Sequence, residues 1–156
     1  SLVVGLTKKG MKNMLETELQ KKTERWVGEQ VSKYWECRVY ELPKFYRLDW
    51  QLMRDGETFG FGEFKGRSYT YAQLEEMGGF MLSLSKFLHM SMTSQHTGLP
   101  VYLFTKLGDL ILSYEHLTGR NQYHKVSRFF KSHRQRKTDV EPAVVIPMDH
   151  FKPVNK

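Results

Sequence analysis

Apolar residues near the start of the chain recur every three or four positions, first over residues 11–19 and again over 27–34. This spacing is typical of an amphipathic helix and predicts helix across residues 8–34. The polar stretch 20–23 and Gly28 weaken the pattern. The sequence therefore leaves open whether this region forms one long helix or two.

The pattern then changes to short segments that favour strands. Segments 36–42, 46–53 and 58–65 are rich in aromatic and branched residues, which is typical of strands. Asp55-Gly56 separates the second segment from the third, and this dipeptide is a strong signal for a two-residue hairpin turn. We expect three consecutive strands, the last two joined as a hairpin.

A second long helix is predicted over residues 71–94, where leucine and methionine repeat at intervals of three and four. Gly78-Gly79 costs helix propensity within it, which we attribute to close backbone packing. The next two apolar segments, 101–105 and 110–114, predict another hairpin, and residues 143–146 predict a short strand. The order helix, three strands, helix and strand places the protein in the α/β class.

The sequence contains no internal repeat, no low-complexity stretch and no linker. A chain of 156 residues has room for one domain with a substantial core. We therefore expect a single domain over residues 1–156, with a core at about 23–115 and a basic extension at 116–156.

Positive charge is concentrated in that extension. The chain has 24 Lys and Arg against 17 Asp and Glu, and residues 116–138 contain no acid. Such a block either is a solvated tail or binds a polyanion, and its interleaved aromatic residues favour nucleic acid. The cations predicted to contact phosphates are Arg120, Lys125, Arg128, Lys131, Arg134, Arg136 and Lys137.

Several other classes of protein and site are not supported by the sequence. It lacks a long apolar run, a leader and a Walker-type phosphate loop, so we expect a soluble protein without a membrane partner or nucleotide cofactor. The single cysteine, Cys37, excludes an intramolecular disulfide and favours a reducing compartment. His89 and His96 lack a third ligand, so a zinc site is not expected.

Candidate chemistry is concentrated on the second and third predicted strands. Glu63 and Lys65 are two residues apart, so both side chains point to one face of a strand. Asp49 lies between apolar neighbours on the preceding strand, where a carboxylate needs a partner or a cation. Two carboxylates directed at one point suit Mg²⁺. The alternative is a surface ion pair on an edge strand.

Asp49 and Glu63-Phe64-Lys65, within this order of elements, resemble the PD-(D/E)XK nuclease superfamily. The resemblance covers about residues 23–106 and is nearest to compact prokaryotic and phage Holliday-junction resolvases and RecB-type nucleases. It implies a restriction-endonuclease-like core with a central mixed sheet flanked by helices. Glu24 matches a further glutamate of the first helix, although Glu16, Glu18 and Glu29 compete for that role. Leu48 stands where many members have proline.

The resemblance implies a metal-dependent DNA endonuclease. Specificity for junctions or branched DNA is one option, and the sequence leaves open whether the substrate is a junction, a flap, a duplex or an end. Asp49, Glu63 and the Phe64 carbonyl would hold Mg²⁺, with Mn²⁺ as a substitute, and Glu24 would complete the acidic cluster. Lys65 would assist the attacking water, and cleavage would leave a 5′-phosphate. It also implies a cytoplasmic location in a prokaryotic cell or phage-infected host. The alternative is a nucleic-acid-binding protein that keeps the fold without cleavage.

Residues just beyond this motif are candidates for DNA contact. Arg67 and Ser68 follow it directly, and Lys86 either extends from the core or reaches DNA. Gln73 has two readings, since related nucleases use a glutamine near this position, whereas Thr70-x-x-Gln73 is also a capping box. We favour capping slightly, and the roles are compatible.

The second long helix raises the question of oligomeric state. Met81, Leu84 and Leu88 lie on one face of the predicted helix. They could belong to the core of a monomer or join two copies in a homodimer, which symmetric cleavage of a junction would require.

A nuclease site formed by Asp49 and Glu63 requires a particular register of the hairpin. With a two-residue turn at Asp55-Gly56 and regular strands, Asp49 and Glu63 would face opposite sides of the sheet. One extra residue, in the turn or in a β-bulge, moves Asp49 across from Glu63. We therefore predict such an irregularity between Trp50 and Gly62.

Overall fold

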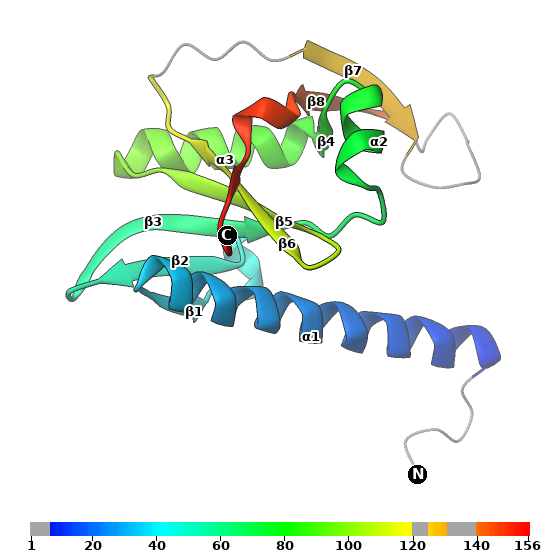
Figure 1. Cartoon of the computed structure of the whole chain (residues 1–156), viewed down its shortest axis with the longest axis horizontal. Helices are drawn as coiled ribbons and strands as arrows, with labels where there is room; N and C mark the ends of the chain where they lie inside the picture. Colours follow the sequence, from blue (N-terminus) through cyan, green and yellow to red (C-terminus); the bar gives the residue numbers. More distant parts are fainter. Residues whose placement is uncertain (1–6, 120–124, 131–139) are drawn as a thin grey trace.

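The computed structural model describes residues 7–119, 125–130 and 140–156. Its three α-helices lie in the first two thirds of the chain, and strands dominate the remainder of the described residues (Figure 1). In chain order they are α1 (Lys8–Trp35), β1 (Arg38–Glu41), the 3₁₀ helix η1 (Lys44–Tyr46), β2 (Trp50–Arg54), β3 (Glu57–Phe64), α2 (Tyr71–Glu76), β4 (Phe80–Ser83), α3 (Leu84–Thr97), β5 (Val101–Leu107), β6 (Leu110–His116), β7 (Lys125–Phe130), β8 (Val140–Ile146), η3 (Met148–His150) and β9 (Lys152–Pro153).

The centre of the fold is a six-stranded sheet in the order β1-β2-β3-β5-β6-β9. It is mixed, because β3 and β5 run parallel while the other neighbours are antiparallel. Helix α1 covers one side of this sheet, and α3 lies on the other with α2 and a second, three-stranded sheet, β4-β8-β7 (Figure 1). This is the predicted restriction-endonuclease-like arrangement.

Both faces of the six-stranded sheet are buried in apolar clusters. Successive residues of β5 enter opposite layers: Leu103 packs toward α3 and β8, whereas Phe104 packs toward α1. Neighbouring residues Ile111 and Leu112 of β6 divide in the same way. Such strands have continuous apolar runs, which explains why 101–105 and 110–114 were predictable as strands.

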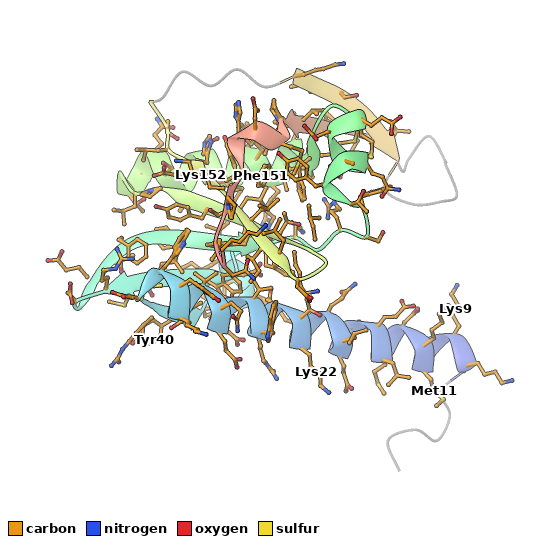
Figure 2. The ribbon with its side chains drawn as sticks, in the orientation of Figure 1. Lys9, Met11, Lys22, Tyr40, Phe151 and Lys152 are labelled. Atoms are coloured by element: carbon orange, nitrogen blue, oxygen red, sulfur yellow. The ribbon has the colours of Figure 1, made fainter. Side chains whose placement is uncertain are left out.

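The first predicted helix is one continuous element. Its N-terminus is capped by Thr7, whose side chain accepts a hydrogen bond from the Gly10 backbone, and it continues to Trp35. Only its C-terminal half packs on the sheet, through Val27, Gly28 and Val31. The N-terminal half, which carries Met11, extends beyond the sheet (Figure 2). Gly28 lies within the continuous helix and faces Trp50, where an added Cβ atom would lie 3.4 Å from the ring.

The prediction of a single helix over residues 71–94 was wrong. Helix α2 ends at Glu76, strand β4 follows, and α3 begins at Leu84. Gly78 and Gly79 have φ angles of 95° and 143°, which turn the chain out of the helix. Met81, Leu84 and Leu88 therefore do not share one helix face: Met81 lies in β4, and Leu84 and Leu88 lie in α3.

Gly79 lies where no other residue fits easily. An added Cβ would lie 2.3 Å from the Ile146 carbonyl oxygen, and the positive φ strains any L side chain. We predict that Gly79→Ala lowers the free energy of unfolding by about 3 kcal/mol or more. Thermal unfolding would then shift down by roughly 6–12 °C. Gly98→Ala is the matched control, since Gly98 has φ 71° but no atom within 4 Å; similar shifts in both variants would contradict the close contact.

Smaller corrections concern segment boundaries. Residues 44–46 form η1 rather than the start of a strand, so β2 begins only at Trp50. Strand β7 lies within the basic extension, where no strand was predicted, and it pairs with β8. Strand β9 closes the large sheet beside β6 and was also not predicted.

Candidate active site

The predicted irregularity is present in the β2–β3 hairpin. Next to the two-residue turn, Arg54 pairs with Glu57 and Met53 with Thr58. The following pair is Leu52 with Gly60, so the register shifts there by one residue, and Phe59 is the extra residue. The register prediction is thus confirmed as a β-bulge.

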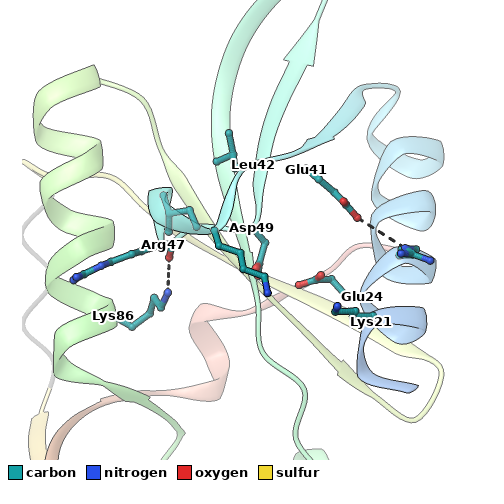
Figure 3. Close-up of a pocket in the computed structure, with 10 residues that line it drawn as sticks. Lys21, Glu24, Glu41, Leu42, Arg47, Asp49 and Lys86 are labelled. Atoms are coloured by element: carbon teal, nitrogen blue, oxygen red, sulfur yellow. Dashed lines mark hydrogen bonds and ion pairs between the residues drawn. The ribbon is translucent and has the colours of Figure 1, made fainter. Parts of the chain in front are cut away.

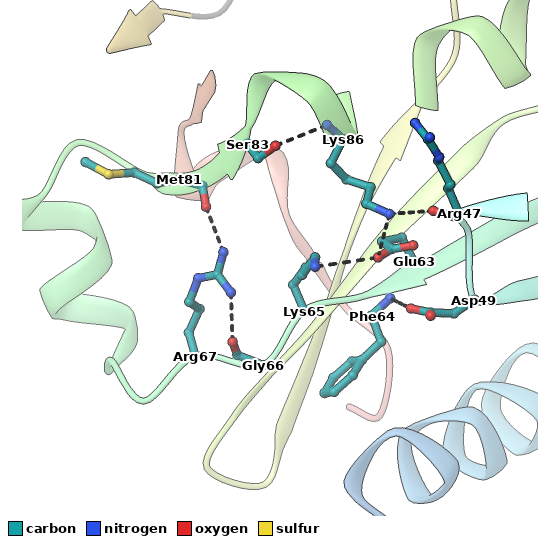
Figure 4. Close-up of polar contacts among 10 residues, drawn as sticks. All are labelled: Arg47, Asp49, Glu63, Phe64, Lys65, Gly66, Arg67, Met81, Ser83 and Lys86. Atoms are coloured by element: carbon teal, nitrogen blue, oxygen red, sulfur yellow. Dashed lines mark hydrogen bonds and ion pairs between the residues drawn. The ribbon is translucent and has the colours of Figure 1, made fainter. Parts of the chain in front are cut away.

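The bulge determines where the candidate carboxylates meet. Beyond it, Trp50 pairs with Gly62, and Asp49 directly precedes Trp50 while Glu63 directly follows Gly62. The Asp49 N–H donates to the Gly62 carbonyl (3.1 Å). Its Oδ2 accepts from the Phe64 backbone N–H (2.8 Å; Figure 4). Asp49 is therefore fixed to the end of β3 that carries the motif.

Glu63 is a buried carboxylate with cationic neighbours on one oxygen only. Its side chain is 4 % exposed, and Oε1 lies 3.3 Å from Lys86 Nζ and 3.8 Å from Lys65 Nζ (Figure 4). Oε2 is buried and has no hydrogen-bond partner. Burial, followed by the charge of Asp49, raises the pKa of Glu63 to about 7, although the two lysines act in the opposite direction.

Glu24 of α1 completes the acidic cluster. It lines a pocket together with Asp49, and the two carboxyl groups point toward one another (Figure 3). Burial raises the pKa of Glu24 to about 7, helped by the charge of Asp49 and a hydrogen bond with it. A buried carboxyl that lies beside other carboxylates and resists ionisation is typical of a site that binds a cation or a proton.

The donor set fits a hard divalent cation. Among the described residues, no three carboxylate, imidazole or thiol side chains form a complete set of metal ligands. Mg²⁺ does not require one, because it usually binds one or two carboxylates and takes its remaining oxygens from water and phosphate. The unpartnered Oε2 of Glu63 and the mutual repulsion with Asp49 are the features that such an ion would relieve.

Two grooves flank the acidic cluster, with volumes of about 410 and 790 Å³, and both are lined by Lys21 and Glu24. The smaller groove also contains Asp49 and Lys86 (Figure 3). The larger groove contains Lys65. The remaining lining is largely polar or basic: Arg25, Glu41, Leu42, Lys44, Arg47 and Leu48 in the smaller groove, and Thr17, Leu19, Gln20, Thr23, Phe64, Gly66, Arg67 and Ser68 in the larger.

Gln73 and Arg67 have structural contacts. The Gln73 side chain accepts from the Thr70 N–H (2.9 Å), and the Thr70 hydroxyl accepts from the Gln73 N–H (3.2 Å), so the capping box is present. Arg67 donates to the carbonyls of Met81 and Gly66 (both 2.9 Å), and burial lowers its pKa. Its guanidinium therefore anchors β4 as well as lining the larger groove.

The basic extension is described only in part. Lys125 is exposed at the start of β7, and the backbone of Arg128 in β7 lies across from Pro142 of β8. The other predicted phosphate contacts of this segment lie outside the described residues: Arg120, Lys131, Arg134, Arg136 and Lys137.

Sequence reasoning missed part of the site. Lys86 was expected either to extend from the core or to reach DNA, and its contacts with Glu63 and the Arg47 backbone carbonyl were not predicted (Figure 4). His89, which was considered only as a zinc ligand, bonds the Tyr46 carbonyl through Nε2 (2.8 Å). No linear motif joins α3 to residues 46–47, so only the fold could reveal these contacts.

Comparison with known protein families decides the assignment. A model of the family described as "phage putative PDDEXK endonuclease" matches residues 11–154. The chain belongs to this family. Searches of curated proteins and of solved structures gave no significant match.

The match to the PDDEXK endonuclease family extends from α1 to the C-terminal strands, beyond the region over which the motif resemblance was identified. It therefore includes the basic extension as well as the hairpin with Asp49 and Glu63. In the described part of this PDDEXK protein, no helix is long and apolar enough to cross a membrane.

Proposed function

We propose that this protein is a Mg²⁺-dependent DNA endonuclease. The observation that carries the proposal is the β-bulge at Phe59, which shifts the hairpin register so that Trp50 pairs with Gly62. Asp49 then lies at the end of β3 that carries Glu63, where its Oδ2 accepts from the Phe64 N–H. A bulge costs a ladder hydrogen bond, and bulges are enriched next to active sites. Membership of a PDDEXK endonuclease family supports the same reading.

Asp49 and Glu63 are the proposed ligands of Mg²⁺ or Mn²⁺, with the Phe64 carbonyl as a third donor and Glu24 acting directly or through water. The bound ion supplies positive charge that stabilises the negative charge gained by the phosphate in the transition state. The hydrogen bond from the Phe64 N–H keeps one Asp49 oxygen oriented, so little reorganisation is needed when the substrate arrives.

Lys65 is the proposed partner of the attacking water. It lies at the end of β3, and its side chain is 38 % exposed toward the larger groove. From there its ammonium can orient the water or neutralise charge on the phosphate. The water oxygen forms a bond to phosphorus while the bond to the 3′-oxygen breaks, which leaves a 5′-phosphate and a 3′-hydroxyl.

The two grooves form the proposed path of the DNA strand. Both grooves are open to solvent beside the acidic cluster and are lined by cationic side chains, so a phosphate backbone could lie along them. Lys44 and Arg47 would contact phosphates on one side of the cut, and Arg67 and Ser68 on the other. The basic extension, including Lys125 and Arg128, would add further phosphate contacts. Specificity for branched DNA, such as flaps and junctions, is part of the proposal because the motif resembles that of junction resolvases.

Labelled DNA of one sequence, prepared as single strand, duplex, flap and four-way junction, tests the proposal. We expect cleavage with Mg²⁺ or Mn²⁺, none in excess chelator, and faster cutting at branches than within uniform duplex. Ca²⁺ should permit binding without cleavage, so fluorescence anisotropy in Ca²⁺ measures DNA affinity separately. Ligation of the products reports the 5′-phosphate.

The alternative function is a DNA-binding protein that has kept the fold without catalysis. Binding in Ca²⁺ with no cleavage of any substrate in Mg²⁺ or Mn²⁺ would support that alternative. Full cleavage in excess chelator would contradict the metal mechanism.

A further inference from the structure

Helix α3 contacts the segment that leads into Asp49 through two side chains one helical turn apart. Lys86 Nζ donates to the Arg47 carbonyl, and His89 Nε2 donates to the Tyr46 carbonyl at 2.8 Å. A carbonyl oxygen can only accept, so the His89 tautomer with hydrogen on Nε2 is the one that fits. We call Lys86 and His89 the α3 clamp.

The clamped carbonyls lie at an exposed irregularity of the backbone. They belong to the end of η1, where Arg47 has a positive φ of 59° and its N–H bonds back to Lys44. The last carbonyls of a helix have no partner within the helix and require one from elsewhere. Here α3 supplies partners for the carbonyls of Tyr46 and Arg47, which lie three and two residues before Asp49.

Lys86 connects this loop to the other carboxylate. Its ammonium also lies 3.3 Å from Glu63 Oε1, and its side chain is only 21 % exposed (Figure 4). One cation thus contacts the backbone that positions Asp49 and the side chain of Glu63. Ser83 caps α3 by accepting from the Lys86 N–H (3.2 Å), which fixes the helix turn from which the clamp extends.

We propose that Lys86 and His89 are positioning residues that hold the Asp49 loop at the distance from Glu63 that a divalent cation requires. The proposal rests on the proposed metal site, but it concerns residues outside the PD-(D/E)XK motif. His89 acts only through the Tyr46 backbone, since it contacts neither carboxylate. A His89 variant therefore tests the clamp without changing the charge of the site.

His89 variants test the clamp without changing any proposed ligand. His89→Phe keeps a ring of similar volume but removes the hydrogen bond, whereas His89→Gln keeps a donor. We expect His89→Phe to weaken Mn²⁺ binding to the DNA-free protein about 10-fold or more, because loss of a residue that orients a metal ligand typically costs 10–100-fold. His89→Gln should recover most of the affinity. Isothermal titration calorimetry with Mn²⁺ measures both.

The exposed His96 on the same helix provides the control, and His96→Ala should bind Mn²⁺ like the parent protein. A positioning role also predicts that cleavage by His89→Phe recovers as the Mn²⁺ concentration rises, whereas a general loss of folding would not recover in this way. Circular dichroism establishes that each variant is folded.

Glu63→Gln separates failure of the clamp from failure of the metal site. If Glu63→Gln loses Mn²⁺ binding while His89→Phe retains the parent affinity, the clamp proposal is wrong and the metal site stands. If Glu63→Gln binds Mn²⁺ as tightly as the parent, the proposed metal site fails and the clamp fails with it.

Discussion

Replacing Glu63 with glutamine is expected to lower the cleavage rate by at least about 10²–10³-fold, the usual cost of removing one electrostatic stabiliser of a transition state. The amide keeps the size of the side chain but removes the negative charge that faces Lys86, Lys65 and the proposed cation. DNA affinity should change little, because phosphate contacts come from the cations that line the grooves. Single-turnover cleavage in Mg²⁺ and anisotropy in Ca²⁺ measure the two effects.

Glu57→Gln is the matched control for this prediction. Glu57 lies at the start of the same strand and is exposed, so the substitution makes the same charge change far from Asp49 along β3. It should leave cleavage near the parent rate. Equal losses in the two variants, or full activity of Glu63→Gln, would remove Glu63 from the catalytic role.

The catalytic hairpin was predictable because its signals are local. Asp55-Gly56 takes the positive φ angles that its turn requires, 55° and 79°, and alternating residues define the two strands. The bulge was inferred from a chemical requirement rather than from a pattern. Its position at Phe59, between Thr58 and Gly60, depends on packing that the sequence does not encode locally.

The second half of the fold was less predictable because its signals are non-local. The apolar spacing of residues 71–94 suits a helix, yet β4 exists because it pairs with β8, about 60 residues later in the chain. Tertiary pairing overrides local propensity in such a segment. The Gly78-Gly79 doublet indicated a break, but it was interpreted as close packing within a helix; close packing does occur, against the Ile146 backbone.

The choice of Glu24 among four helical glutamates also depended on tertiary structure. The turn containing Val27 and Gly28 packs on Trp50, so Glu24, one turn earlier, lies beside Asp49. Glu16, Glu18 and Glu29 are exposed. Apolar spacing from Val27 to Val31 could indicate the buried face, but it could not specify which strand that face would meet.

The stability of the metal-free protein is expected to fall as the pH rises from about 4.5 to about 7. In the folded state the pKa of Glu63 and of Glu24 is raised from 4.5 to about 7, mainly by burial. Between these values the folded protein holds protons that the unfolded chain releases, so the free energy of unfolding decreases with pH. A tenfold change in proton affinity corresponds to about 1.4 kcal/mol, so the titration of Glu63 alone should lower the free energy of unfolding by on the order of 3 kcal/mol over this pH range.

A divalent cation should reverse this loss. Above pH 7 both carboxyls are ionised, and Mg²⁺ at 100 times its Kd would stabilise the native state by about 2–3 kcal/mol. Urea unfolding at several pH values, with Mg²⁺ and with chelator, measures the effect. In Glu63→Gln the slope between pH 5 and 7 should become shallower, because glutamine does not titrate while Glu24 still does, and the Mg²⁺ effect should disappear, because glutamine supplies no anionic ligand. Two outcomes would contradict this prediction: a free energy of unfolding that rises from pH 5 to 7 in chelator, or one that does not change with Mg²⁺ at pH 8. Either would show that Glu24 and Glu63 do not form the strained acidic cluster expected of a metal site.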